Sequence, residues 1–240
     1  MTYHFTAASI APIIGCLLTI VRSTIPLREV VSIRKEHRIG EFNPMPFAAM
    51  ILNHTGWVVY AVLHTDWFIF SAETTGLLCG IWITFSLYPL SNEKMQNRLS
   101  GLVVVAGLVY CILALVTMVL KTAAPSKVTV MWSWAVSVTQ VLLYAAPLST
   151  IVQAIRDRSS ASFHLGLAVM GFVSSSMWTV YGSTSKNLFI LVPSLLGALL
   201  TLMALAVCGL FPRTREPQTP AQRQQSQFRN LERAVELPVR

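Results

Sequence analysis

Long apolar stretches separated by short polar segments dominate this chain of 240 residues. Each stretch is close to 20 residues long, the length at which an α-helix crosses the ~30 Å hydrocarbon core of a bilayer. They lie at about residues 7–31, 45–63, 67–90, 99–120, 128–151, 163–181 and 188–210. The pattern predicts an all-α membrane protein with seven transmembrane helices. The connecting segments are too short to form a domain outside the membrane.

The apolar pattern contains an internal duplication. A shift of 121 residues aligns Pro26 with Pro147, Phe42 with Phe163, Trp57 with Trp178, Tyr60 with Tyr181, and Gly76 with Gly197. Each copy has three helices and one further helix separates them, so both copies run in the same direction across the bilayer. We expect two parallel three-helix bundles, formed by helices 1–3 (residues 7–90) and helices 5–7 (residues 128–211). The fourth helix, residues 99–120, is expected to link them as a lipid-facing spacer.

Positive charge is distributed unevenly along the chain, whose formal net charge is +8. Of the 18 Lys and Arg residues, 14 fall in the loops on one predicted side or in the C-terminal segment, and three fall on the other side. Because such residues accumulate on the cytoplasmic side, we expect the N-terminus outside and the C-terminus in the cytosol. Residues 212–240, rich in Pro, Gln and Arg, are expected to be a disordered cytosolic tail. The positive charge then indicates orientation and attraction to membrane lipid, not binding of nucleic acid.

Two charged residues, Arg22 and Glu73, lie well inside the predicted spans. Each costs ~2.5–3.5 kcal/mol at the centre of a bilayer on insertion scales, so neither is expected to face lipid. We hypothesise that they face one another across a central cavity. The alternative is a structural ion pair that locks the bundle. A buried carboxyl such as Glu73 could also carry a proton, although a nearby arginine would oppose this.

Tryptophan and short polar residues are paired across the duplication. Asn53 and Trp57 are four residues apart and share one helix face, and Ser174 and Trp178 are their counterparts. An indole stacks on the apolar face of a sugar ring while the polar group reaches the hydroxyls. For a single Trp, anchoring at the membrane interface is the alternative. Prolines at matched depth, Pro26 and Pro147, indicate hinges, with ordinary kinking as the alternative.

Signatures of enzymes and metal sites are absent from the sequence. It has no HExxH, GxSxG or Gly-rich phosphate-loop motif, and its His and Cys residues show no metal-ligand spacing. His54 and His64 lie near the second helix without such companions. The four cysteines fall inside spans, where packing is the expected role. We expect no enzyme activity, metal or cofactor.

Several motifs resemble the SWEET sugar-transporter family. In the first copy they are Pro26-Leu27-Arg28, the run Gly-Glu-Phe-Asn-Pro-Met-Pro-Phe at residues 40–47, Leu52-Asn53, Trp57 and Tyr60; in the second they are Tyr-Ala-Ala-Pro-Leu-Ser at residues 144–149 and Trp-Thr-Val-Tyr-Gly at residues 178–182. The resemblance covers about residues 7–211. It implies a facilitative uniporter of mono- or disaccharides, with alternating access between two triple-helix bundles. Many members of the family are oligomers.

The resemblance also implies roles for individual residues. The implied solute pocket consists of Thr19, Arg22, Asn53, Trp57, Ser174 and Trp178, with Gln140 and Leu143 as counterparts in the fifth helix. The implied hinge and gate residues are Pro26, Pro46, Pro147, Tyr60 and Asn187, the last in place of the family's usual aspartate. Glu73 and Ser194 replace two pocket asparagines of the family. The fourth hinge proline is missing, since no proline occurs between Pro147 and Pro193.

The sequence therefore ranks a bidirectional sugar uniporter first, as a homo-oligomer in the plasma membrane ahead of an endomembrane. The charged pocket favours a second interpretation, a transporter of another polar solute such as an amino acid, coupled to protons through Glu73. A PQ-loop transporter shares the duplication, but expects Pro-Gln where this chain has Pro-Leu twice. A seven-helix receptor or scaffold shares the topology, but does not predict the repeat.

Overall fold

The computed structural model describes residues 7–40, 42–160, 163 and 165–212. The tail expected at 212–240 therefore lies outside the described residues, apart from Pro212. Throughout the described part the regular elements are helices, and seven segments are long and apolar enough to cross a membrane. The helices are α1 (Ala7–Glu36), α2 (Met45–His64), α3 (Trp67–Leu87), α4 (Glu93–Ala123), α5 (Pro125–Leu143), α6 (Ala145–Arg156), α7 (Leu165–Thr184) and α8 (Leu188–Leu210), with a 3₁₀ turn, η1 (Tyr88–Leu90), after α3. The prediction of seven spans is confirmed.

The fifth span, expected as one helix over residues 128–151, consists of the two helices α5 and α6. Helical hydrogen bonding is interrupted at Tyr144, whose N–H bonds to the carbonyl of Val141, and it resumes with Leu148 bonding to Tyr144. Pro147 has no N–H to donate to the carbonyl four residues earlier, and its ring crowds that carbonyl. Its counterpart Pro26 lies inside the continuous helix α1. The matched prolines therefore break the helix in one half only.

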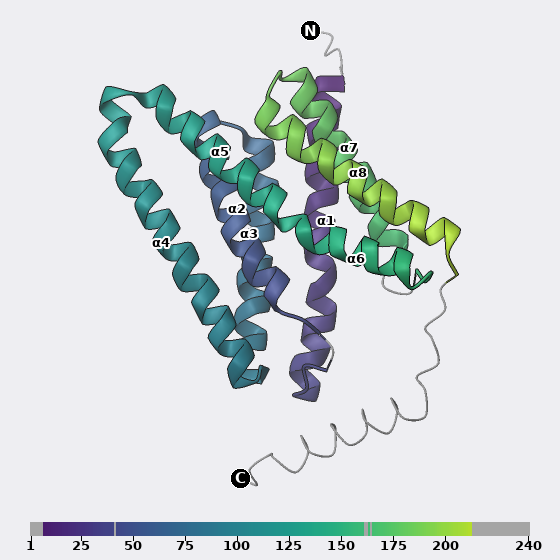
Figure 1. The fold of residues 1–240 in the computed structure, drawn as a ribbon. Coiled ribbons are helices and arrows are strands. Elements are labelled where there is room, and N and C mark those ends of the chain that lie inside the picture. The colour runs from purple at the N-terminus through teal and green to yellow at the C-terminus, as the bar shows by residue number, and fades with distance from the viewer. Residues whose placement is uncertain (1–6, 41, 161–162, 164, 213–240) are drawn as a thin grey trace, which may run out of the picture.

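The helices form two bundles that meet along two matched contacts. In the first bundle α3 packs against both α1 and α2, and in the second α8 packs against α5, α6 and α7. Across the boundary α1 packs against α7, and α2 packs against α5 (Figure 1). Because α1 corresponds to α5–α6, and α2 to α7, these two contacts are the same contact made twice. They are the interface on which any movement of one half against the other must act.

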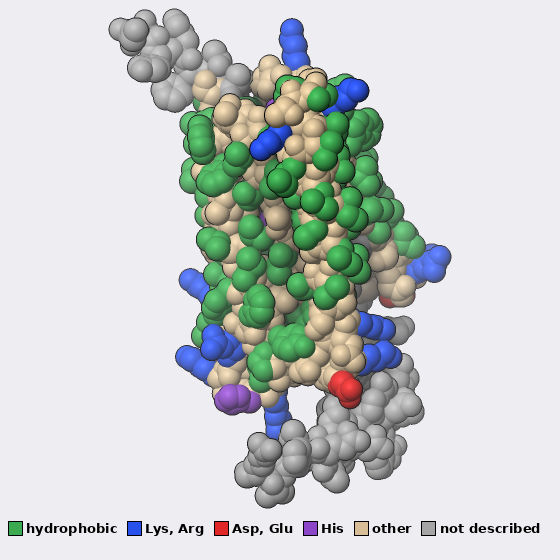
Figure 2. All heavy atoms as spheres, turned by 90° about the vertical axis from the view of Figure 1, so that its left-hand side faces the viewer, with side chains coloured by type: hydrophobic (Ala, Val, Ile, Leu, Met, Phe, Trp, Pro, Cys, Tyr) green, Lys and Arg blue, Asp and Glu red, His purple; other side chains and the backbone are tan. Residues whose placement is uncertain are grey.

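Helix α4 lies outside both bundles, as the sequence predicts (Figure 1). Its side chains, such as Val104, Leu115 and Val119, are largely exposed, and hydrophobic side chains cover this side of the molecule between Lys and Arg side chains near its two ends (Figure 2). It is nevertheless fastened to the bundles. The Tyr110 hydroxyl donates to the Leu52 carbonyl of α2, and the Trp132 indole of α5 donates to Thr117 Oγ1 at 2.9 Å.

The duplication extends to the caps of α3 and α8. Thr65 and Lys186, at matched positions, both adopt left-handed backbone angles, with φ of 52° and 54°. The next residue caps the following helix in both halves: Asp66 Oδ1 accepts from the N–H groups of Phe68 and Ile69, and Asn187 accepts from that of Phe189. Such caps satisfy amide groups that the first turn leaves without a partner. Each capping side chain keeps one further polar atom free for the other bundle.

Candidate functional site

Two matched hydrogen-bonded clusters lie where the bundles meet. In the first, the Trp178 indole of α7 donates to Thr19 Oγ1 of α1 at 3.0 Å, and the Thr19 and Ser174 hydroxyls are 3.2 Å apart. Thr19 and Ser174 are buried. Ser174 and Trp178 are four residues apart on α7, so both reach α1 from one helix face. We call these three residues the Thr19 cluster.

The second cluster occupies the matched positions between α2 and α5. Asn53 Nδ2 donates to Gln140 Oε1 at 2.8 Å, and the Trp57 indole donates to the same oxygen at 3.3 Å. Thr139 Oγ1 donates to Asn53 Oδ1 at 3.3 Å. We call Asn53, Trp57 and Gln140 the Gln140 cluster. A shift of 121 residues carries every member of the Thr19 cluster onto a member of this one, so the duplication applies to side-chain contacts as well as to helices.

The indole ring of each cluster packs against a tyrosine three residues later on the same helix. The Trp57 ring lies edge-on to Tyr60 at a centroid distance of 5.1 Å, and Trp178 lies edge-on to Tyr181 at 5.9 Å. Gly15 of α1 lies directly against the Trp178 ring, because a Cβ at this position would be 3.1 Å from the indole Cε2. The sequence did not single out Gly15, since a glycine inside an apolar helix carries no chemical signal of its own.

Two tyrosine bonds close the Asp66 end of the boundary. Asn187 Nδ2 donates to Tyr60 Oη at 2.6 Å, and Tyr181 Oη donates to Asp66 Oδ2 at 2.6 Å. Tyr60 is fully buried in an apolar cluster that includes Ile69 and Ile190. The sequence placed Tyr60 and Asn187 together and missed the second bond. Applying the 121-residue shift to Tyr60 and Asn187 would have found Tyr181 and Asp66.

The carboxylate of Glu73 is paired with His54, not with Arg22. His54 Nδ1 lies 2.6 Å from Glu73 Oε2, and both side chains are largely buried, with 7% and 16% of their surface exposed. Within the described residues Arg22 and Glu73 do not form the structural ion pair that was the alternative for these two charges, and the carboxylate has its partner on the adjacent helix of the same bundle. Gly76 makes room for the imidazole, since a Cβ at this position would lie 2.5 Å from His54 Cε1. The spacing of His54 from other His and Cys residues, which indicates a metal site, does not indicate this role. A buried carboxylate such as that of Glu73 is stabilised by a basic partner, and His54 of α2 is that partner.

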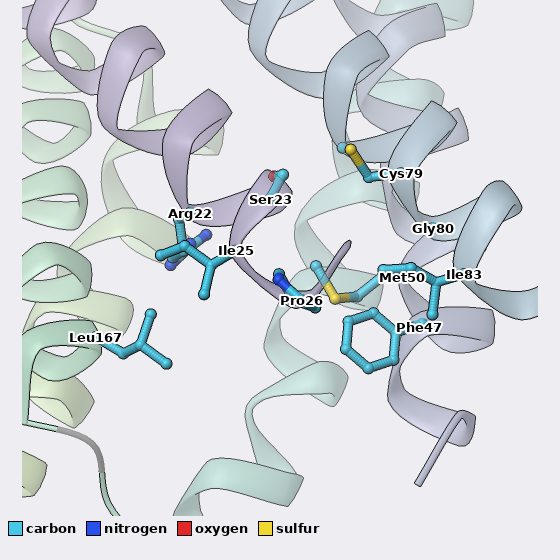
Figure 3. Close-up of a pocket in the computed structure, with 11 residues that line it drawn as sticks. Arg22, Ser23, Ile25, Pro26, Phe47, Met50, Cys79, Gly80, Ile83 and Leu167 are labelled. Carbon is cyan, nitrogen blue, oxygen red and sulfur yellow. The ribbon is translucent and has the colours of Figure 1, made fainter. Parts of the chain in front are cut away.

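A cavity of about 240 Å³ begins at Arg22, one turn of α1 beyond Thr19 (Figure 3). Its wall comes from α1, α2 and α3, with Leu167 of α7 completing it. Arg22 lies at this cavity, three residues from Thr19 on α1, and Pro26 follows one turn later. Most of the remaining lining is apolar, including Phe47 and Ile83.

The remaining predicted residues are placed as follows. Pro26 lies within the continuous helix α1, whereas Pro46 and Pro147 fall in the first turns of α2 and α6. A first-turn proline costs no helical hydrogen bond, so these two do not kink the helices that contain them. Ser194 is half-buried on α8, next to Pro193, whose carbonyl accepts a bond of 2.9 Å from Tyr144 Oη. Within the described residues, no group of three His, Cys, Asp or Glu side chains is placed to hold a metal.

The fold and the site together define a class: membrane proteins of two parallel repeats with polar groups gathered at mid-depth between the halves, as in secondary transporters. A family model described as "Sugar efflux transporter for intercellular exchange" matches residues 10–95 and 130–216. The chain belongs to this family, the SWEET transporters, whose members are transporters and not enzymes.

Individual relatives are distant but match most of the chain. The chain is 26% identical over 206 residues to the bidirectional sugar transporter SWEET7 of Arabidopsis thaliana, which covers 84% of this chain and 80% of the relative. It is 21% identical over 197 residues to the sugar transporter SWEET1 of Dictyostelium discoideum, covering 81% and 89%. A eukaryotic SWEET transporter solved at 3.7 Å resolution superposes with a TM-score of 0.74 at 18% identity, covering 85% of this chain and 95% of that one. The last comparison supports the fold alone.

Proposed function

We propose that this protein moves sugars across a membrane in both directions, as a uniporter, by alternating access between its two bundles. The observation that carries the proposal is the pair of matched clusters at the bundle boundary. The Thr19 cluster and the Gln140 cluster present hydroxyl, amide and indole groups at matched positions, and the hydrogen bonds of each cluster join one bundle to the other. A solute with hydroxyl groups on both sides of a ring can bond to both.

The energetics of these clusters suit a facilitative carrier. Each hydrogen bond within the two clusters joins neutral groups, and a neutral hydrogen bond contributes ~0.5–1.5 kcal/mol net. A sugar hydroxyl that replaces Asn53 at Gln140, or Trp178 at Thr19, exchanges one such bond for another of similar strength. The apolar face of the sugar ring can then stack on the face of the indole ring. Because the exchange is nearly balanced, the bundles can separate around a solute and close again without an energy source.

The tyrosine bonds at the Asp66 end provide the gate of this proposal. Tyr60–Asn187 and Tyr181–Asp66 both join one bundle to the other, so both must break before this end opens. With the N-terminus outside, we assign this end as the extracellular gate, and the two bonds would hold it closed. Pro26 lies in α1 beside the cavity, where the missing hydrogen bond of a mid-helix proline makes bending easiest.

The arrangement in the membrane forms part of the same proposal. We infer functional units at residues 7–90 and 128–211, a linker at 99–120, and a cytosolic tail at 212–240. The 14-to-3 distribution of Lys and Arg supports an external N-terminus, and it favours contact with anionic lipid on the cytosolic side. A homo-oligomer in the plasma membrane is the expected assembly. Limited protease digestion of sealed cells expressing the protein with terminal tags tests the orientation.

A second candidate, proton-coupled transport, is favoured by the His54–Glu73 pair. His54 Nδ1 and Glu73 Oε2 are 2.6 Å apart, a distance at which the two side chains can share a proton. Within range of the pair are Cys16 on α1 and Tyr144 at the α5–α6 break, on which the Glu73 charge acts, together with Arg22 on α1. A solute whose arrival changed the contacts of Glu73 would change its affinity for a proton, and the two would then move together.

Counterflow in proteoliposomes tests both candidates. Purified protein is reconstituted and the uptake of labelled glucose, sucrose and a panel of amino acids is measured, with and without a pH gradient. Uptake of a sugar at the same rate with and without the gradient supports uniport. Acceleration by an inward proton gradient that is lost in Glu73→Gln would replace uniport by coupled transport. Uptake of an amino acid and of no sugar would overturn the sugar assignment, and a receptor would transport neither.

A further inference from the structure

The side chain of Arg22 lines the cavity that α1, α2 and α3 form with Leu167 of α7 (Figure 3). It is three residues after Thr19, so both side chains project from the same face of α1. One guanidinium nitrogen lies 3.9 Å from the position that a Cβ on Gly171 of α7 would occupy. Arg22 therefore reaches from the first bundle to the second, one helical turn from Thr19.

This guanidinium has no partner in the described part of the chain, where it makes neither a hydrogen bond nor an ion pair. Its neighbours at the cavity are mainly apolar, among them Ile25, Phe47, Met50 and Leu167. An arginine side chain stays charged at any physiological pH. Loss of a proton therefore cannot relieve the free-energy cost of placing its charge among apolar side chains. Charged groups inside a membrane are stabilised by a partner or by a water-filled path, and they mark binding sites by default.

Glu73 does not neutralise Arg22. Arg22 and Gly76, which follows Glu73 by three residues on α3, line the same cavity. The carboxylate is nevertheless held by His54 at 2.6 Å, and no ion pair joins it to Arg22 within the described residues. The positive charge of Arg22 is then left over.

We propose that Arg22 binds the carboxylate of an acidic sugar, a single ring with hydroxyl groups and one carboxyl group, such as a uronic acid. The proposal rests on the sugar transport proposed above and names its substrate class. A guanidinium matches a carboxylate with two parallel hydrogen bonds. One carboxylate balances the one unpaired charge, whereas a phosphate would leave an excess of negative charge. The counterpart of Arg22 in the second half is Leu143, so the site is charged at one end only, as a ring with one carboxyl group requires.

The test compares two solutes that differ in this group. Uptake of labelled glucose or labelled glucuronate into proteoliposomes is measured. The membrane potential is clamped with potassium and valinomycin, so that it does not drive the movement of the charged glucuronate. The variants are Arg22→Leu, which copies the second half, and Arg22→Lys, which keeps the charge but loses the two-pronged geometry. Arg98→Leu is the control, since it removes an exposed positive charge on α4, away from the cavity.

We expect the wild type to take up glucuronate, and glucuronate to compete with glucose. Arg22→Leu should lower the ratio of glucuronate to glucose uptake at least tenfold, about 1.4 kcal/mol, with Arg22→Lys intermediate and Arg98→Leu at the wild-type ratio. Glucose uptake without glucuronate uptake or competition in the wild type would overturn this inference and leave the proposed function standing. Uptake of glucuronate alone would support Arg22 and overturn transport of neutral sugars. Transport of neither would overturn both, and stronger competition by glucose 6-phosphate than by glucuronate would overturn the assignment to a carboxylate.

Discussion

The hydroxyl of Tyr181 donates a 2.6 Å hydrogen bond to the carboxylate of Asp66, and this bond joins the second bundle to the first. Its counterpart in the other half, Asn187 with Tyr60, is also 2.6 Å long but has no charged member. A hydrogen bond to a charged group contributes ~1.5–3 kcal/mol, about twice the ~0.5–1.5 kcal/mol of a neutral one. The two sides of the gate are therefore alike in geometry and unequal in strength.

Removal of the Tyr181 hydroxyl should open the Asp66 end more than removal of the Tyr60 hydroxyl. Tyr181→Phe and Tyr60→Phe keep the rings, so only the bonds are lost. A cysteine introduced at buried Ile190, in a variant without the native cysteines, reports opening through its reaction with a membrane-impermeant thiol reagent. We expect the labelling rate to rise about tenfold or more in Tyr181→Phe and less in Tyr60→Phe. Tyr88→Phe removes an exposed hydrogen bond between Tyr88 of η1 and Ser100 of α4, and it should leave the labelling rate unchanged. Equal rates in all three would remove the gate from the proposal.

Substitution of either member of the His54–Glu73 pair should destabilise the first bundle. Loss of one partner of a buried pair costs up to ~3–5 kcal/mol, and we expect less here because Glu73 is partly exposed. His54→Gln, Glu73→Gln and the double variant form a thermodynamic cycle, measured by thermal unfolding in detergent. The coupling should be ~0.5–3 kcal/mol, since the two side chains are in contact. The corresponding cycle with Arg22→Leu and Glu73→Gln should be close to additive, and strong coupling there would restore the pairing that the sequence suggested.

Gly76→Ala should disturb the same pair through packing alone. A Cβ at Gly76 would lie 2.5 Å from His54 Cε1, so the imidazole must move away from Glu73. Overpacking of this kind costs ~1–3 kcal/mol, seen as a lower unfolding temperature. Gly101→Ala on α4 is the matched control, because nothing lies within 4 Å of its Cβ position and alanine favours the helix by ~0.8–1.0 kcal/mol. A Gly76→Ala variant as stable as Gly101→Ala would contradict the tight contact.

Thr19→Val should weaken solute binding. The hydroxyl of Thr19 accepts from the Trp178 indole and lies beside the Ser174 hydroxyl, so its loss removes one polar group from the proposed site. One neutral hydrogen bond, about 1 kcal/mol, corresponds to a roughly fivefold rise in the concentration for half-maximal counterflow. Thr117→Val is a close control, since Thr117 also accepts from an indole, that of Trp132, but outside the bundle boundary. An equal effect of both substitutions would indicate loss of stability and not loss of a binding group.

The duplication explains why so much of the site could be predicted. Once Tyr60, Trp57 and Asn53 were aligned with their counterparts, the sequence named most members of both clusters. It failed where the halves differ. Nothing in the spacing of residues distinguishes Pro26, inside a continuous helix, from Pro147, after a break. Arg22 and Glu73 were matched by charge, because a sequence shows which charges lie in a membrane and not which side chains are neighbours.

The sequence by itself determined the number of spans, their order and the parallel repeat, because these follow from the length of apolar segments and from a shift of identical residues. Only the tertiary structure decided the pairing of the intramembrane charges. The sequence offers two basic side chains as partners for Glu73, Arg22 on α1 and His54 on α2. The packing of α2 on α3 over Gly76 places His54 in contact with the carboxylate. Arg22 lines the cavity and, within the described residues, forms no ion pair with Glu73.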